Sequence, residues 1–306
     1  MARLVFMGTP EFAVPSLRTL AAEHDVTGVV SQPDRRVGRG LKLSTAPTKA
    51  TAEELGIPVI TPTSLLDENS LSQIADWKPE LIVVVAYGHI LRHELLALPA
   101  RGCLNVHASL LPRHRGAAPV AAAILAGDTR TGVTIQQMEA SLDTGPVLAQ
   151  GEITIDAEHT TGALTTELAT LGAHLLRQTI PSYLSGKVRP RPQDDALATY
   201  APKLRKDDGR LHFSHSAVEL ARQVRAMQPW PGAFALRRTQ PFRVLRADAA
   251  SGNAPPGLVL RDSGNIAVGT GDGLLRLRRI QPPGKRAMAP ENYARGAPDF
   301  IGDTLR

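Results

Sequence analysis

The segment "LIVVVA", Leu81 to Ala86, is apolar at every position. A short continuous apolar run of this kind is typical of a parallel strand in the centre of a sheet, where helices cover both faces. The segment therefore decides the fold class of the first half of the chain. We expect a doubly wound α/β domain there.

Similar strand-like runs and helical patterns alternate around this segment. Further short β-branched or apolar runs occupy 3–7, 26–31 and 102–107. Amphipathic helical patterns occupy 14–23, 46–55 and 65–76. Two alternating segments, 131–138 and 146–155, then predict antiparallel strands, and a helix is expected over about 162–184.

The remainder of the chain has a different character. In "GKVRPRPQDDALATYAPKLRKDDGR", residues 186–210, prolines and charged residues interrupt any helical or strand-like pattern of apolar residues, which is typical of a linker. After a short helix at 217–227, closely spaced strands with the turns "DSGN" and "TGDG" predict a small β-barrel of the oligonucleotide-binding type. We therefore expect an α/β domain over 1–188, a linker over 189–208 and a β-barrel over 209–306.

Positive charge is concentrated in the last third of the chain. The net charge is +6, and residues 209–306 carry 15 Lys and Arg against 7 Asp and Glu. A concentrated positive field favours a polyanionic partner, nucleic acid above all, because each neutralised phosphate releases counterions. The charge alone leaves a merely solvated arginine-rich surface as the alternative.

Composition excludes several classes of protein. Cys103 is the only cysteine, so an internal disulfide framework and a zinc cluster of thiolates are excluded. We see neither a signal peptide nor an apolar run near the roughly 20 residues that span a bilayer, so we expect a cytoplasmic protein without membrane contact. "GTPEFA", Gly8 to Ala13, lacks the later glycines of GxGxxG, and no GxxxxGK[ST] motif occurs, which disfavours dinucleotide and nucleoside triphosphate chemistry.

The best candidate for a catalytic loop is "NVHASLLPRHRGAAP", Asn105 to Pro119, at the end of a predicted strand. Asn105 and His107 are two residues apart, so on an extended strand their side chains face the same side. An amide can stabilise an oxyanion and an imidazole can transfer a proton, as acyl transfer requires. A purely structural hydrogen-bonded pair is the alternative.

Asp143 in "SLDTGPVL", Ser141 to Leu148, is a candidate partner for His107. A nearby carboxylate would orient the imidazole ring, whereas the alternative is an Asp that only caps its own turn. The chain has no GxSxG motif, and Cys103 lies inside a predicted strand, so we expect direct transfer without a covalent enzyme intermediate.

A basic loop follows the second predicted strand. "SQPDRRVGRGLKLSTAPTK", Ser31 to Lys49, holds Arg35, Arg36, Arg39, Lys42 and Lys49. Such a loop could close on a phosphate backbone, and a solvated basic loop is the alternative.

Together these segments resemble one family. "MGTPEFAVPSL", "GRGLKL", "VVAYGHIL", "NVHASLLPRHRGAAPV", "SLDTGPVL" and "MQPWPGAF" occur here in the order found in methionyl-tRNA formyltransferases, and the resemblance covers nearly the whole chain. It implies a Rossmann-like formyltransferase domain followed by an oligonucleotide-binding-like barrel. The implied reaction moves a formyl group from 10-formyltetrahydrofolate to the methionine amine of charged initiator tRNA, with no metal and with the enzyme expected to be a monomer.

The resemblance also implies roles for individual residues. Asn105, His107 and Asp143 would be catalytic. The folate would be bordered by Ser109, Leu110, Leu111, Pro112, Ala86, Tyr87, Gly88 and Ile90. Arg39 and Lys42 would bind the tRNA.

Three other functions remain open from the sequence. Another folate-dependent formyltransferase, acting on an amino sugar or on glycinamide ribonucleotide, or the hydrolase domain of formyltetrahydrofolate dehydrogenase, would share the Asn105, His107 and Asp143 pattern. A non-catalytic RNA-binding protein would share the basic barrel. A nucleotide-dependent oxidoreductase is disfavoured by the missing glycines.

Overall fold

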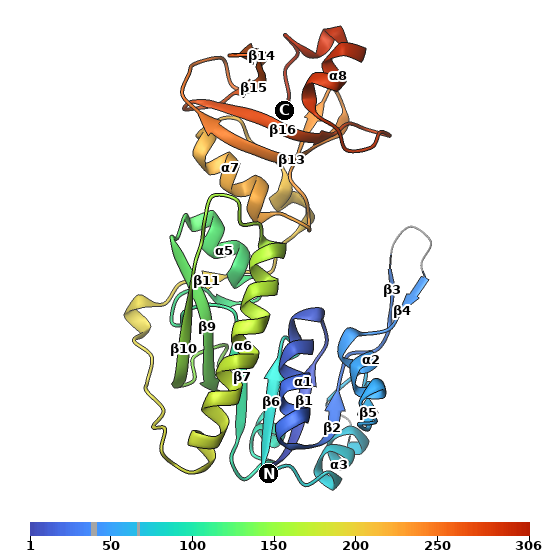
Figure 1. Cartoon of the computed structure of the whole chain (residues 1–306), viewed down its shortest axis with the longest axis vertical. Coiled ribbons are helices and arrows are strands. Elements are labelled where there is room, and N and C mark those ends of the chain that lie inside the picture. Colours follow the sequence, from blue (N-terminus) through green and yellow to red (C-terminus); the bar gives the residue numbers. More distant parts are fainter. Residues whose placement is uncertain (38–41, 66–67) are drawn as a thin grey trace. The chain divides into compact units, whose positions relative to one another are not determined.

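The computed structural model describes residues 1–37, 42–65 and 68–306 (Figure 1). The chain forms two compact units. The first consists of Met1–Pro119, Arg130–Thr154 and Thr165–Ala201, and the second of Val120–Thr129, Ile155–Leu164 and Pro202–Arg306. The chain therefore leaves the first unit and returns to it twice before it ends in the second. The domain boundaries expected at 188 and 208 stay a prediction.

A seven-stranded sheet forms the centre of the first unit. In spatial order its strands are β10 (Val147–Thr154), β9 (Arg130–Gln137), β7 (Cys103–His107), β6 (Leu81–Val85), β1 (Arg3–Gly8), β2 (Asp25–Val30) and β5 (Val59–Ile60). The strands from β7 to β5 are parallel, whereas β9 runs antiparallel to both of its neighbours, β7 and β10. The predicted α/β fold and the antiparallel pair are confirmed.

The all-apolar strand β6 lies between β1 and β7, as its composition predicts. Ile82 and Val84 pack in a cluster with Ile74 of α3 and Leu95 of α4. The alternate residue, Val83, is equally buried. Both faces of the strand are therefore covered, and the driving force for this position is burial of its whole apolar surface.

Helices connect these strands. Those in the first two thirds of the chain are α1 (Val14–Glu23), α2 (Pro47–Glu54), α3 (Glu68–Asp76), α4 (His93–Leu96), α5 (Pro119–Ala126) and α6 (Thr161–Leu184). Within the described part of the chain, no helix combines the length and apolar character needed to cross a membrane.

Two segments that carry no periodic pattern also contain short strands. In the basic loop, β3 (Arg35–Val37) and β4 (Lys42–Ser44) pair in an antiparallel hairpin. In the expected linker, β11 (Tyr200–Ala201) pairs in parallel with β8 (Arg115–Gly116), after a turn of 3₁₀ helix at Asp195–Leu197. Residues up to Ala201 thus pack in the first unit.

The second unit holds a five-stranded antiparallel sheet in the order β12 (Phe234–Arg237), β13 (Gln240–Ala250), β16 (Leu274–Gln281), β15 (Asn265–Gly269) and β14 (Val259–Asp262). The last residues of the chain bridge its two edges, because Leu305 pairs with Arg237 and Thr304 with Leu258. These bridges satisfy edge groups that would otherwise stay unpaired. The predicted small barrel with hairpin turns is confirmed.

The last third of the chain adds α7 (Ala217–Ala226) and α8 (Pro290–Gly296) to this unit, which also includes residues 120–126 of α5. A capping box begins α7, since the Ser216 hydroxyl accepts from the Glu219 amide and the Glu219 carboxylate accepts from the Ser216 amide. The barrel core contains Phe242, Tyr293 and Phe300, whose ring centroids lie 5.1–5.7 Å apart.

Candidate active site

Strand β7 places Asn105 and His107 on one side of the sheet. In the register with β9, Asn105 lies opposite Gln136 and His107 opposite Thr134. The two residues are separated by one position, so the pleat of the strand directs both side chains the same way. Both also lie near Asp143, which follows β9.

The carboxylate of Asp143 accepts hydrogen bonds from several polar groups of this region. Its Oδ1 accepts from the side-chain amides of Gln136 at 3.0 Å and Asn105 at 3.5 Å, and its Oδ2 accepts from the backbone amide of Gly116 at 2.9 Å. The Nδ1 of His107 lies 3.6 Å from Oδ1. The end of strand β7 and the turn after β9, which carry the candidate catalytic residues, therefore meet in space.

Both ring nitrogens of His107 face oxygen atoms. Nε2 lies 2.9 Å from the carbonyl oxygen of His114, and Nδ1 faces the Asp143 carboxylate. The side chain of His107 is 7% exposed and that of Asp143 is 11% exposed, so water screens this contact little. The two oxygen neighbours therefore fix the orientation of the imidazole ring.

Two residues around the carboxylate have backbone conformations with positive φ angles. Asp143 has φ 54°, in the left-handed region that Asp tolerates better than most residues. Gly116 has φ 117°, and a Cβ there would lie 2.6 Å from the carbonyl oxygen of Ala201. Only glycine lets the chain approach so closely while its amide reaches Asp143.

Sequence reasoning missed three side chains of this network: Gln136, Arg115 and Gln193. Gln136 could have been found, because it belongs to the alternating strand that pairs with the Asn105 strand. Gln193 lies in the expected linker, and its side-chain amide donates to the carbonyl oxygens of Asp143 at 2.9 Å and Gly145 at 2.7 Å. No local pattern indicates that contact.

The segment expected to border a folate, Ser109 to Pro112, follows β7 directly. Thr134 fixes it, because its hydroxyl accepts from the Leu111 amide at 3.0 Å and donates to the Ser109 carbonyl at 2.7 Å. Ser109 is buried and donates to the Arg113 carbonyl at 2.6 Å. Leu111 is buried, whereas Leu110 and Pro112 are half-buried.

The other expected folate segment, Ala86 to Ile90, follows β6. Ala86 has φ 48° and is exposed, as is Gly88, and Ile90 is 78% exposed. The Tyr87 ring instead packs in the core cluster, where burial raises its pKa to about 12. The Tyr87 carbonyl accepts from the Gln32 side-chain amide at 2.7 Å.

Of the expected tRNA-binding residues, Arg39 lies outside the described residues. Lys42 begins β4, where its backbone pairs with Val37, and its side chain is likewise outside the described part. At the base of this hairpin, the Asp34 carboxylate accepts from the Lys49 ammonium at 2.8 Å and from the Ala46 amide at 3.2 Å. The hydrogen bond between the Lys49 ammonium and the Asp34 carboxylate raises the pKa of Lys49 and lowers the pKa of Asp34.

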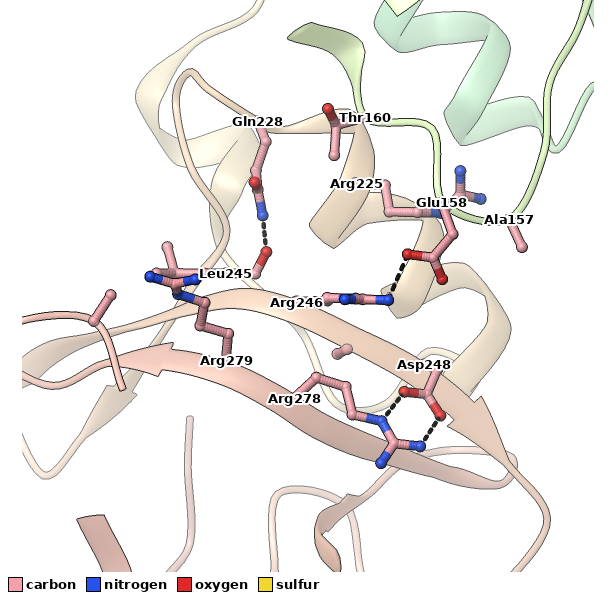
Figure 2. Close-up of a pocket in the computed structure, with 12 residues that line it drawn as sticks. Ala157, Glu158, Thr160, Arg225, Gln228, Leu245, Arg246, Asp248, Arg278 and Arg279 are labelled. Atoms are coloured by element: carbon pink, nitrogen blue, oxygen red, sulfur yellow. Dashed lines mark hydrogen bonds and ion pairs between the residues drawn. The ribbon is translucent and has the colours of Figure 1, made fainter. Parts of the chain in front are cut away.

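A cavity of about 860 Å³ lies within the second unit (Figure 2). Arg225, Arg246, Arg278 and Arg279 line it together with Glu158 and Asp248. Arg246 pairs with Glu158 at 2.6 Å, and Arg278 with Asp248 at 2.9 Å. Arg246 and Arg279 are direct cross-strand neighbours on β13 and β16. The cavity is thus rich in cations, and the residues that line it belong to the second unit.

Among residues 1–37, 42–65 and 68–306, no three His, Cys, Asp or Glu side chains gather in a way that could hold a metal ion. The side chains of Asn105, His107 and Asp143 themselves offer hydrogen bonding, charge stabilisation and proton transfer.

Comparisons with known proteins identify the family. A formyl transferase family model matches residues 2–180, and a model of the formyl transferase C-terminal domain matches 203–298. The methionyl-tRNA formyltransferase of Roseiflexus castenholzii is 45% identical over 99% of this chain and 98% of its own. That of Ectopseudomonas mendocina is 48% identical over 94% of this chain and 92% of its own.

Solved structures agree in fold. An N-formyltransferase from Helicobacter canadensis, in complex with folinic acid and dTDP-3-aminofucose, superposes with a TM-score of 0.70 at 17% identity, over 90% of this chain and 98% of that one. The sugar 3N-formyl transferase WlaRD gives a TM-score of 0.70 at 16% identity, over 94% of this chain and 99% of that one. At such identities the likeness concerns architecture, and it is the sequence match over nearly the full length that places this chain in the methionyl-tRNA formyltransferase family.

Proposed function

We propose that this enzyme transfers the formyl group of 10-formyltetrahydrofolate to the α-amino group of methionine carried by initiator tRNA. The observation that carries the proposal is that Asn105 and His107 of strand β7 meet Asp143 of the turn after β9, in a chain of this family. An amide, an imidazole and a carboxylate are the groups that direct transfer of an acyl group to an amine requires.

The transfer proceeds by attack of the neutral amine on the formyl carbon. A carbon–nitrogen bond forms, and the formyl oxygen becomes an oxyanion. The bond to the folate nitrogen then breaks, and that nitrogen receives the proton that the amine loses. Each stage develops charge that water-excluded donors can stabilise.

Asn105 supplies the donor for the oxyanion. One of its two amide hydrogens is directed at Asp143, at a long 3.5 Å, which leaves the other for the substrate. The His107 imidazole lies on the same side of β7 as Asn105, and the His114 carbonyl and the Asp143 carboxylate orient its ring. Asp143 acts as the orienting anion, because four donor groups already surround its oxygens.

Ser109 to Pro112 and the exposed part of Ala86 to Ile90 form the folate site in this proposal. The support is their position after the neighbouring parallel strands β7 and β6, since ligands of open α/β sheets bind outside the carboxyl ends of the strands. Ile90 offers an exposed apolar surface of the kind that a flat pterin ring covers. Tyr87 contributes only backbone atoms to this folate site, since its ring is buried.

The barrel contributes phosphate contacts to the tRNA. Arg246 and Arg279 lie directly opposite each other, an arrangement that is unfavourable unless an anion accompanies them. Glu158 neutralises Arg246 in part, as Figure 2 shows. A phosphate backbone would supply the remaining negative charge. Arg39 and Lys42 are proposed to contact the same RNA on the strength of the family pattern.

An acceptor of another kind is not favoured. Relatives at 40–48% identity are methionyl-tRNA formyltransferases, whereas the sugar N-formyltransferases share only 16–19%. The deciding experiment supplies labelled 10-formyltetrahydrofolate with charged initiator tRNA, uncharged tRNA or an amino sugar nucleotide. We expect label only in the first acceptor. Transfer to the amino sugar, or to none of the three, would refute the proposal.

A further inference from the structure

We infer that Gln193 is a positioning residue for formyl transfer, which fixes the Asp143 turn through the backbone and thereby aims the carboxylate at His107. The inference rests on the proposed function of the site. Gln193 lies 50 residues beyond Asp143, in the segment between α6 and β11.

The contacts of Gln193 are directed at the backbone of the turn. Its side-chain amide donates to the carbonyl oxygens of Asp143 and Gly145, at 2.9 and 2.7 Å, and lies 3.4 Å from the Gln136 side-chain oxygen. Gln136 itself donates to the Asp143 carboxylate. Gln193 therefore touches both the turn and the residue that supports its side chain.

Arg115 fixes Gln193 from the other side. The side-chain oxygen of Gln193 accepts from Arg115 Nε at 3.1 Å and Nη2 at 2.9 Å, which fixes the orientation of the Gln193 amide. The Arg115 side chain is only 2% exposed, and its carboxylate partner, Asp195, lies at 2.7 Å. Because a buried guanidinium must keep its hydrogen bonds, this geometry is costly to disturb.

The main chain around Gln193 is anchored on both sides. Before it, the amide and carbonyl of Arg191 exchange hydrogen bonds with those of Val147, at 2.8 and 2.9 Å. After it, β11 pairs with β8, so that Ala201 lies opposite Gly116. Gln193 is thus held between two backbone pairings, and the second involves the residue whose amide binds the Asp143 carboxylate.

The need for such support follows from the conformation of the turn. A non-glycine residue in the left-handed region costs free energy and persists when its surroundings hold it there. At Asp143 those surroundings are the Gln193 amide on the carbonyl side and Gly116 on the carboxylate side. When Gln193 is removed, the turn relaxes and the 3.6 Å approach of the carboxylate to His107 is lost.

The test compares Gln193→Leu with the matched control Gln223→Leu in the full-length protein. Gln223 makes the same kind of contact elsewhere, because its side-chain amide donates to the carbonyls of Asp208 and Arg210 at 2.8 and 3.0 Å. We expect Gln193→Leu to lower kcat about tenfold to a hundredfold with KM for donor and charged tRNA unchanged, since small misplacement of catalytic groups costs that much. Gln223→Leu keeps its kcat. Equal kcat losses in both variants, or a Gln193→Leu effect confined to KM, would overturn the inference.

A second variant and a second measurement separate this result from misfolding and from the proposed function. Gln193→Glu keeps an acceptor for Arg115 but turns an oxygen toward two carbonyls, so we expect the same loss of kcat. Hydrogen exchange of the amides in 141–145 is expected to speed up about tenfold in Gln193→Leu. Unchanged exchange would overturn the inference whether or not the enzyme transfers a formyl group. Absence of transfer by the unsubstituted enzyme would refute only the proposed function.

Discussion

Asp143→Asn is the most informative single change at the candidate active site, because it keeps the shape of the side chain and removes its charge. The carboxylate accepts from Gln136 and Asn105 on one oxygen and from Gly116 on the other. An amide has only one acceptor oxygen, so its NH₂ group must face at least one of these donors. A buried donor left without a partner costs about 1–3 kcal/mol.

The variant also removes the negative charge that lies 3.6 Å from Nδ1 of His107 and orients the ring. We therefore expect kcat for formyl transfer to fall by about 10²–10⁴, the range typical of lost proton-transfer or oxyanion groups, with KM for charged tRNA nearly unchanged. Single-turnover transfer at saturating donor is the direct measurement. Asp262→Asn is the control, because Asp262 accepts from Arg276 at 2.8 Å in the barrel and should be replaceable without loss of kcat. A kcat for Asp143→Asn within about threefold of the unsubstituted enzyme would refute the orienting role.

Three other changes test separate features. Asn105→Ala should lower kcat by about 10²-fold or more, because the oxyanion donor is lost, while tRNA binding measured by filter retention stays the same; normal turnover would exclude Asn105 from catalysis. Arg279→Glu should raise KM for charged tRNA and flatten its dependence on salt, whereas Arg295→Glu on α8 should do neither; an unchanged salt slope would remove the barrel cavity from the RNA site. Burial raises the pKa of the Cys103 thiol from 9.0 to about 12, so the unfolded chain ionises first, and the unfolding free energy should fall by about 1.4 kcal/mol per pH unit between pH 9 and 12. Calorimetry from pH 8 to 11 should show a shallower decline for Cys103→Ala, and parallel curves would contradict the assignment.

The parts of the fold that follow a period could be predicted from the sequence. Leu81–Val85 is buried at all five positions, and a short run of this composition is typical of the interior of a sheet. The alternation of apolar and polar residues along β9 and β10 predicted antiparallel strands, because such alternation is typical of that kind of strand. At the site, the spacing of Asn105 and His107 was enough to place both on one side, because a strand repeats every two residues.

The meeting of Asp143 with His107 could not be predicted, because it depends on tertiary contacts between loops. The two-residue strands β8 and β11 are too short to show a period, yet their pairing brings Gly116 to the carboxylate. The prolines and charges around Gln193 predicted a linker, yet the segment up to Ala201 packs in the first unit. The Gln193 side chain nevertheless contacts the turn, since a single amide bonding to backbone carbonyls leaves no mark in the pattern of hydrophobicity.

The segment His114, Arg115 and Gly116 shows why the reactive residues alone do not define this site. The His114 carbonyl faces Nε2 of His107, the Arg115 side chain orients Gln193, and the Gly116 amide binds the Asp143 carboxylate. Three consecutive residues thus constrain the imidazole, the turn and the carboxylate at the same time. Because β8 holds this segment against β11, a displacement of either strand would move all three contacts together. The relative positions of the imidazole, the turn and the carboxylate therefore depend on the pairing of β8 with β11. The proline-rich segment after α6 supplies β11, and it packs in the same unit as Asn105, His107 and Asp143.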